Sequence, residues 1–97
     1  MNKYTLKLYV TGQTTRSQSA VANLRRTCEA ALPGQYDLTI VDVLENPQLA
    51  EDNKILATPT LVRESPHPTR RIIGDLSDEN KVLFGLGLRQ NEEVALL

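Results

Sequence analysis

Few side chains in this 97-residue chain could perform chemistry. Its single cysteine, Cys28, and its single histidine, His67, cannot form a usual zinc site without two further carboxylates. Cys28 lies on the apolar side of a predicted helix and is interpreted as a buried structural thiol, whereas His67 stands between two prolines of a predicted exposed loop. Asp42 and Asp75 fit strand-end and turn positions and have no base or metal partner. We therefore predict no catalytic residue, no metal and no cofactor, and we do not expect an enzyme.

Composition excludes several classes of partner. Eleven lysines and arginines against twelve acidic residues give a net charge of −1, which argues against bulk electrostatic binding to nucleic acid or to a membrane surface. The five glycines form no phosphate-binding loop, and no stretch approaches the ~18 apolar residues of a membrane span. With one cysteine and no long apolar stretch at the N-terminus, a cytoplasmic protein is expected.

A cluster of arginines is the strongest candidate for a binding surface. Arg63, Arg70 and Arg71 lie on one predicted hairpin, where they would form a local basic patch in an otherwise neutral protein. Arginine is favoured at protein interfaces because its planar guanidinium presents several donors at once. The alternative is a merely solvated face.

The hydropathy pattern predicts seven elements in one domain. Strands are expected at 4–10, 37–43, 60–63 and 70–73, and helices from about 17 to 32, from 47 and from 77. Asn46 is expected to cap the second helix, with Pro47 in its first turn, and Ser77 is expected to cap the third. The resulting order, βαβαββα, is that of a single thioredoxin-like α/β domain.

Pro59 stands at the start of a predicted strand, where a missing backbone donor is tolerated. Thioredoxin-like domains place such a proline opposite a helix N-terminus that usually carries a redox cysteine pair. Here that region is Thr14–Ser17, without a cysteine, so dithiol chemistry is excluded.

The segment 81–88 fits two kinds of secondary structure. Its apolar residues have helical spacing, yet Val82, Phe84, Leu86 and Leu88 also alternate as a strand would. A glycine weakens a helix by about 1 kcal/mol relative to alanine, and the segment contains two of them. It is interpreted either as a helix that frays at its end or as a conformationally ambivalent segment.

Four runs of residues, in order, resemble the KaiB family of clock proteins: Leu6–Gly12, Ile40–Ala50, Ile55–Leu61 and Arg70–Ser77. The resemblance extends from Tyr4 to about Leu88. It implies a non-enzymatic protein with two states, a tetrameric ground state ordered βαββααβ and a thioredoxin-like monomer. The monomer would bind the hexameric ATPase ring of a KaiC-like protein, compete with a SasA-type kinase sensor domain and, where KaiA exists, help to sequester it.

The resemblance also assigns roles to residues. It implies that Pro59, which is cis in the thioredoxin-like state, Gly85 and Gly87 take part in the fold switch, and Gly85→Ala is expected to favour that state. It places Lys7, Arg63, Arg70 and Arg71 near the partner-binding and oligomer surfaces. Four features differ from the family's usual pattern. Gly87 replaces an aspartate, His67 stands where a proline is frequent, and Thr39 replaces a basic residue. The tail 89–97, expected to be flexible, is short and less acidic.

Two functions remain open after this comparison. The first is a regulator that binds the KaiC-like ring and modulates its phosphorylation cycle in a circadian or timer system. The second is an adaptor in stress signalling, partnering a histidine kinase or another protein and keeping no time. Self-association into a tetramer or dimer is compatible with both.

Overall fold

The structure, a computed structural model, describes residues 4–88. The elements run in the order that the sequence predicts, βαβαββα. They are β1 (Tyr4–Val10), α1 (Thr15–Ala31), β2 (Tyr36–Asp42), α2 (Pro47–Asp52), β3 (Thr60–Ser65), β4 (Arg70–Ile73) and α3 (Glu79–Gly85). The tail 89–97, expected to be flexible, lies outside the described residues.

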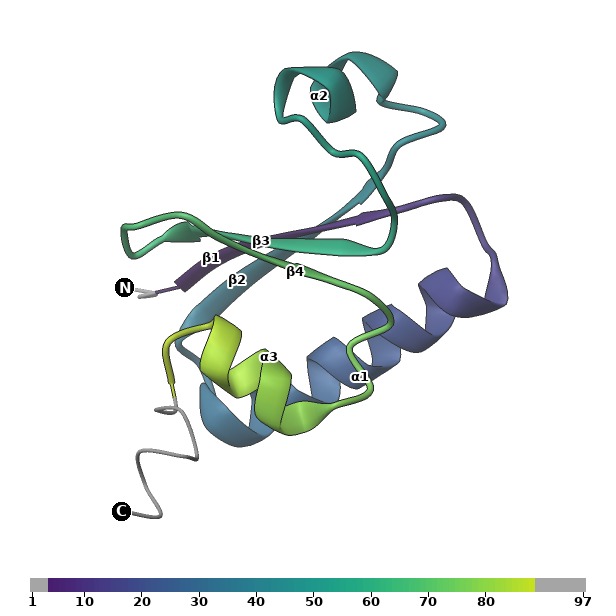
Figure 1. Cartoon of the computed structure of the whole chain (residues 1–97). Helices are drawn as coiled ribbons and strands as arrows, with labels where there is room; N and C mark the ends of the chain where they lie inside the picture. The colour runs from purple at the N-terminus through teal and green to yellow at the C-terminus, as the bar shows by residue number, and fades with distance from the viewer. Residues whose placement is uncertain (1–3, 89–97) are drawn as a thin grey trace.

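The four strands form one sheet in the order β2-β1-β3-β4. β1 pairs with β2 in parallel, as a strand–helix–strand connection requires, and β3 pairs antiparallel with both β1 and β4. Figure 1 shows α1 and α3 side by side on one face of the sheet and α2 on the opposite face, beyond the ends of the strands. The residues of the two central strands are therefore covered from both sides at one end.

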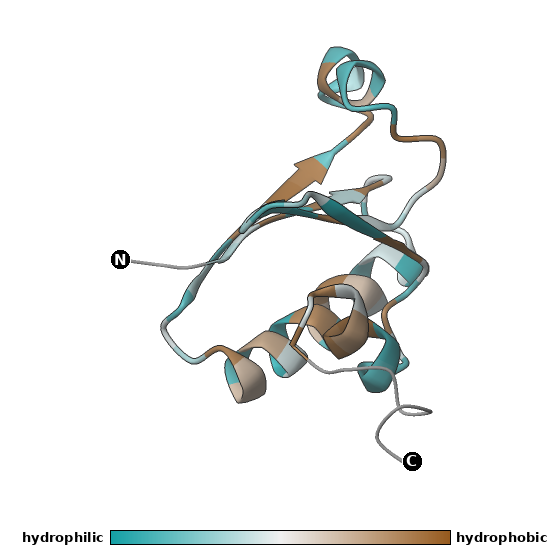
Figure 2. Cartoon of the chain, turned by 60° about the vertical axis from the view of Figure 1, so that its left-hand side comes forward, coloured by the Kyte–Doolittle hydropathy of each residue, from teal (hydrophilic) through white to brown (hydrophobic). Residues whose placement is uncertain are grey.

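The larger core lies between the sheet and the helix pair α1 and α3. Because successive strand residues point to opposite faces, Leu6 and Leu8 of β1 and Leu61 of β3 share the face toward these helices, and all three are fully buried. Leu24 and Val82 pack against them from α1 and α3. Figure 2 shows apolar stretches on the strands and on both helices below the sheet.

A smaller core lies on the other face, beneath α2. Tyr9, Val41 and Val62 are buried there, and Leu49 and Ile55 pack against them. β1 is thus buried on both faces near its end. No helix in the part of the chain that the structure describes is long and apolar enough to cross a membrane.

Helix boundaries follow local capping. α1 begins two residues earlier than predicted because the Thr14 hydroxyl accepts a hydrogen bond from the Ser17 amide, and it ends just before Pro33. The predicted cap of the third helix is wrong: Asp78 accepts from the Lys81 amide, whereas the Ser77 amide donates to the Asp75 carboxylate.

The second helix also begins differently from the prediction. Asn46 occupies the cap position of α2, but its side-chain amide donates to the Asp42 carbonyl instead of accepting from the helix. Pro47 stands in the first turn, as predicted, because its missing N–H is not needed there.

The ambivalent segment 81–88 is helical as far as Gly85 in this fold. The helical part of the first interpretation, a helix that frays at its end, is therefore correct for this state. Gly87, with φ of +81°, follows the helix in the left-handed region. The alternative order βαββααβ stays a prediction.

Candidate partner-binding surfaces

Arg63 is buried, which contradicts the predicted surface patch of three arginines. Its residue is 5% exposed, and its guanidinium reaches the C-terminal end of α3. Nη1 donates to the Leu86 carbonyl at 2.6 Å and Nη2 donates to the Pro68 carbonyl at 2.7 Å. The cation thus satisfies a carbonyl that a helix end leaves without an intrahelical donor.

Gly87 makes the space for this guanidinium. A Cβ atom at Gly87 would lie 2.8 Å from Nη1 of Arg63, closer than real Cβ contacts allow. The family pattern has an aspartate at this position. In this fold, the Cβ of any side chain at residue 87 would collide with Arg63.

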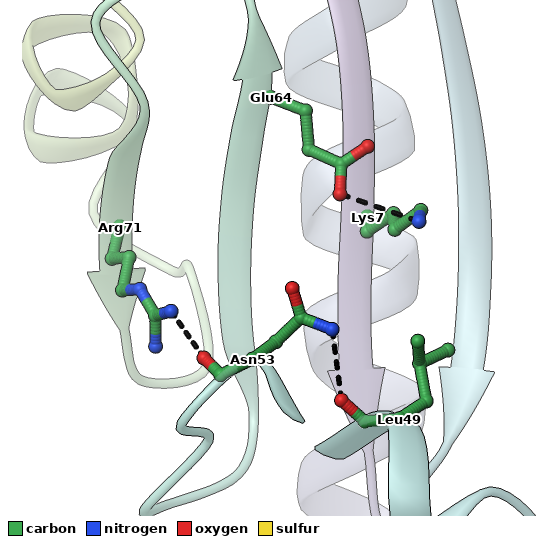
Figure 3. Close-up of polar contacts among 5 residues, drawn as sticks. All are labelled: Lys7, Leu49, Asn53, Glu64 and Arg71. Atoms are coloured by element: carbon green, nitrogen blue, oxygen red, sulfur yellow. Dashed lines mark hydrogen bonds and ion pairs between the residues drawn. The ribbon is translucent and has the colours of Figure 1, made fainter. Parts of the chain in front are cut away.

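Arg71 plays the corresponding role on the opposite face of the sheet. Its guanidinium donates to the carbonyls of Asn53 and Lys54, which follow α2, the latter at 2.9 Å. Asn53 in turn donates to the Leu49 carbonyl, as Figure 3 shows. Arg71 therefore ties β4 to the C-terminal end of α2.

Lys7 and Arg70 are the remaining predicted partner-binding residues. Lys7 pairs with Glu64 at 3.3 Å between Nζ and Oε2, with both side chains about one-third exposed. The Arg70 side chain is exposed and makes no hydrogen bond or ion pair within residues 4–88. Lys7, Arg70 and Arg71 thus reach the surface in different settings, and their role in partner binding stays a prediction.

The predicted fold-switch residues Pro59 and Gly85 occupy tight positions. The Thr58–Pro59 peptide bond is cis, as the resemblance predicts, and the Thr58 hydroxyl lies 2.5 Å from that of Thr11, in the loop before α1. A Cβ at Gly85 would lie 2.5 Å from Cδ1 of Ile72. The expected helix gain of Gly85→Ala is therefore opposed by a contact with β4.

A groove lined mainly by apolar residues opens beside α2. It has a volume of about 570 Å³ and lies between α2 and the segment that leads to β3. Its lining residues are Val43, Pro47, Ala50, Glu51, Lys54, Ile55, Leu56, Ala57 and Thr58. Leu56 is 94% exposed at its edge, and Leu44 is exposed nearby in the chain. Sequence reasoning missed this groove, because exposure of an isolated leucine leaves no periodic signal.

The side chains considered first for chemistry have structural roles. Cys28 is fully buried, and burial raises the pKa of its thiol to about 11, so it is protonated and unreactive at neutral pH. Asp42 accepts from the backbone amides of Gly12 and Leu44, and Asp75 accepts from Ser77, which also lowers the pKa of Asp75. No group of three potential metal ligands occurs within the described residues.

Tyr9 also carries a buried polar group, and sequence reasoning did not identify it. It is fully buried under α2, and its hydroxyl has no hydrogen-bond partner in the described part of the chain. Burial raises the pKa of this phenol. A neutral hydroxyl in an apolar core is consistent with a packing role.

One sequence signal could have located Arg63 correctly. In a strand, residues two apart share a face, so Arg63 lies on the same side as Leu61, whereas Arg70 and Arg71 must point to opposite sides. Strand alternation alone therefore excludes a single patch of all three arginines.

The fold has clear relatives among solved structures. The N-terminal domain of Synechococcus elongatus SasA matches with a TM-score of 0.73 and 25% identity, covering 94% of this chain and 90% of that one. Mitochondrial thioredoxin 3 of Saccharomyces cerevisiae matches with a TM-score of 0.71 and 18% identity, covering 90% and 79%. The molecule is a thioredoxin-like domain whose one cysteine is buried in its core.

Sequence relatives define the family more narrowly. The KaiB domain family model matches residues 7–88. The circadian clock protein KaiB3 of Synechocystis sp. (strain PCC 6803) is 52% identical over 88 residues, 91% of this chain and 86% of that protein. The circadian clock oscillator protein KaiB of Synechococcus elongatus (strain PCC 7942) is 56% identical over 89 residues, 92% and 87%. The chain belongs to the KaiB family, which confirms the resemblance.

Proposed function

We propose that this protein is a non-enzymatic regulator that binds the ATPase ring of a KaiC-like protein in the thioredoxin-like fold. Membership of the KaiB family over residues 7–88 is the observation that carries the proposal. The likeness of the fold to the SasA N-terminal domain supports a shared mode of docking, in which the two domains compete for the ring.

The structure offers a surface suited to this role. The groove beside α2, with Leu56 at its edge, is apolar and open, and exposed apolar surface marks interaction sites more often than scattered single residues do. Arg71 holds the end of α2 and so positions one wall of the groove.

The proposal includes a second packing of the C-terminal half in a self-associated ground state. Two packings need differ by only a few kcal/mol to interconvert, and a partner that binds one of them raises its population. Gly85 and Gly87 would set this balance, because in the thioredoxin-like fold a side chain at Gly85 would collide with Ile72 and one at Gly87 would collide with Arg63.

Native mass spectrometry of the chain, alone and after hours with a KaiC-like hexamer, tests the proposal. An oligomer that slowly gives way to a ring complex is the expected result. Failure of the chain to bind the ring in every nucleotide state would overturn the proposal and favour the stress-signalling adaptor. A binding assay with histidine kinase sensor domains would then test that second function. Adding KaiA as a third component tests whether KaiA is a further partner of the ring complex.

A further inference from the structure

Arg63 joins two segments that are distant from one another in sequence. One nitrogen of its guanidinium bonds the Leu86 carbonyl at the end of α3, and the other bonds the Pro68 carbonyl in the loop 66–69 between β3 and β4. We infer that Arg63 is a coupling residue, through which the conformation of the loop 66–69 controls the docking of α3.

The buried Arg63 guanidinium depends on these two carbonyls for its hydrogen bonds. Nε of Arg63 is buried and has no partner within the described residues, so the two Nη atoms provide the bonds that compensate for burying the charge. A buried cation that loses an acceptor is unfavourable, because its desolvation is no longer compensated. If either carbonyl is displaced, burial of the Arg63 guanidinium becomes less favourable, and its hydrogen bond to the other carbonyl is weakened as well.

α3 is a short helix, so its docking depends on the tertiary contacts that it makes. It has seven residues, lies against α1 and β4, and contributes Val82 to the larger core. Short helices gain most of their stability from tertiary packing. Loss of the Arg63 bond would therefore release α3 before the central strands open.

The loop is accessible to a partner. Pro66, His67, Pro68 and Thr69 are all exposed, whereas the guanidinium beneath them is buried. A molecule that moved the Pro68 carbonyl on the surface would change α3 docking without touching α3. This coupling goes beyond the proposed ring binding and is a property of the free chain.

Hydrogen exchange measured on the free protein tests the coupling without any partner. Replacing proline frees φ of residue 68, so Pro68→Ala loosens the backbone that presents the carbonyl. We expect Pro68→Ala to speed exchange of the 82–88 amides at least fivefold, with the β1 and β2 amides unchanged. Pro33→Ala is the control, because Pro33 is an exposed proline that lies outside the loop 66–69.

The decisive comparison repeats Pro68→Ala in an Arg63→Met background. Arg63→Met alone should speed exchange of the 82–88 amides at least tenfold, and Pro68→Ala should then add no further change there. Additive effects of the two substitutions would overturn the coupling. Arg63→Lys serves if the methionine variant does not fold: one ammonium cannot reproduce the two-nitrogen fork, so the Pro68→Ala effect should shrink at least twofold. An undiminished effect would contradict the inference.

Discussion

Arg70 and Arg71 are neighbours in sequence and differ in what their side chains do. Arg71 donates to two carbonyls at the end of α2, whereas Arg70 is exposed without a hydrogen bond or ion pair in the described residues. The same residue type on the same strand thus provides a matched pair, in which one cation supports a helix end and the other is solvated.

Arg71→Met should destabilise the protein by about 1–2 kcal/mol, because hydrogen bonds from a charged group are lost and the α2 carbonyls return to water. Arg70→Met should stay within about 0.5 kcal/mol of the parent, as surface substitutions usually do. Urea unfolding of both variants makes the measurement. Equal destabilisation by the two would show that the contacts of Arg71 contribute nothing.

Cys28 gives stability a pH dependence at high pH. Its pKa is raised from the ordinary 9.0 to about 11 by burial, so above pH 9 the unfolded chain releases a proton that the folded chain keeps. Stability should be unaffected by this group below pH 9 and should fall between pH 9 and 11, by up to about 3 kcal/mol.

Thermal unfolding of the parent and of Cys28→Ala between pH 8 and 11 measures this difference. The alanine variant should be less stable than the parent at pH 8 because it leaves a cavity, but it should lose less stability as the pH rises. The raised phenol pKa of Tyr9 acts in the same direction and is common to both proteins. Parallel pH profiles would contradict the assignment.

At the scale of elements, the side chain of Ile72 on β4 limits which residue can occupy position 85 of α3. A helix gains up to about 1 kcal/mol when alanine replaces a glycine, and the gain is smaller at Gly85 than in a helix interior because Gly85 is the last residue of α3. In this fold the new Cβ would lie 2.5 Å from Cδ1 and 2.6 Å from Cγ1 of Ile72, so β4 opposes the gain. The outcome of Gly85→Ala therefore depends on whether Ile72 can change its rotamer.

A double-mutant cycle separates the two effects. Ile72→Ala removes both contacting atoms, so Gly85→Ala should stabilise α3 by about 1 kcal/mol more in the Ile72→Ala background than in the parent. The free energy of unfolding of the four proteins gives the coupling. Additive substitutions would mean that Ile72 yields without cost, and the helix propensity of residue 85 alone would then govern the balance.

A second glycine comparison belongs to the same scale. Gly34 and Gly87 both have φ in the left-handed region, +69° and +81°, but only Gly87 has a neighbour that a Cβ would strike. Gly87→Ala should therefore be more destabilising than Gly34→Ala, by about 1 kcal/mol or more, since overpacking adds to the backbone strain common to both. Equal losses in urea unfolding would show that Arg63 moves aside freely.

At the scale of the whole molecule, α2 and α3 lie on opposite faces of the sheet, as Figure 1 shows, and the groove lies beside α2. Leu56 is almost fully exposed, so its removal should leave stability unchanged. If the groove is where the ring docks, Leu56→Ser should weaken ring binding at least tenfold, about 1.4 kcal/mol.

Binding of the Leu56→Ser variant to a KaiC-like hexamer is measured by biolayer interferometry. Ala30→Ser, exposed on α1 and away from the groove, is the control and should bind as the parent does. Full affinity of Leu56→Ser would place the docking surface elsewhere, with Lys7 and Arg70 as the next residues to replace.

Several parts of the molecule were determined by the sequence alone. The order of the seven elements, the proline in the first turn of α2 and the family follow from patterns within two to four residues or from whole runs of matched residues. Such patterns are readable because the pleat of a strand and the turn of a helix repeat at these spacings.

Strand alternation indicates which side of the sheet each arginine faces, but the hydrogen-bond partners of Arg63 and Arg71 were decided only by tertiary structure. Arg63 meets the Leu86 carbonyl, and Arg71 meets the Lys54 carbonyl, through contacts that span 23 and 17 residues. The groove beside α2 likewise exists only because α2 packs against the strand ends. Contacts at such separations depend on how the elements stack on the two faces of the sheet, and no local periodicity encodes them. The chain alone therefore predicts which residues carry charge, whereas the packing determines which charges hold helices in place and which face a partner.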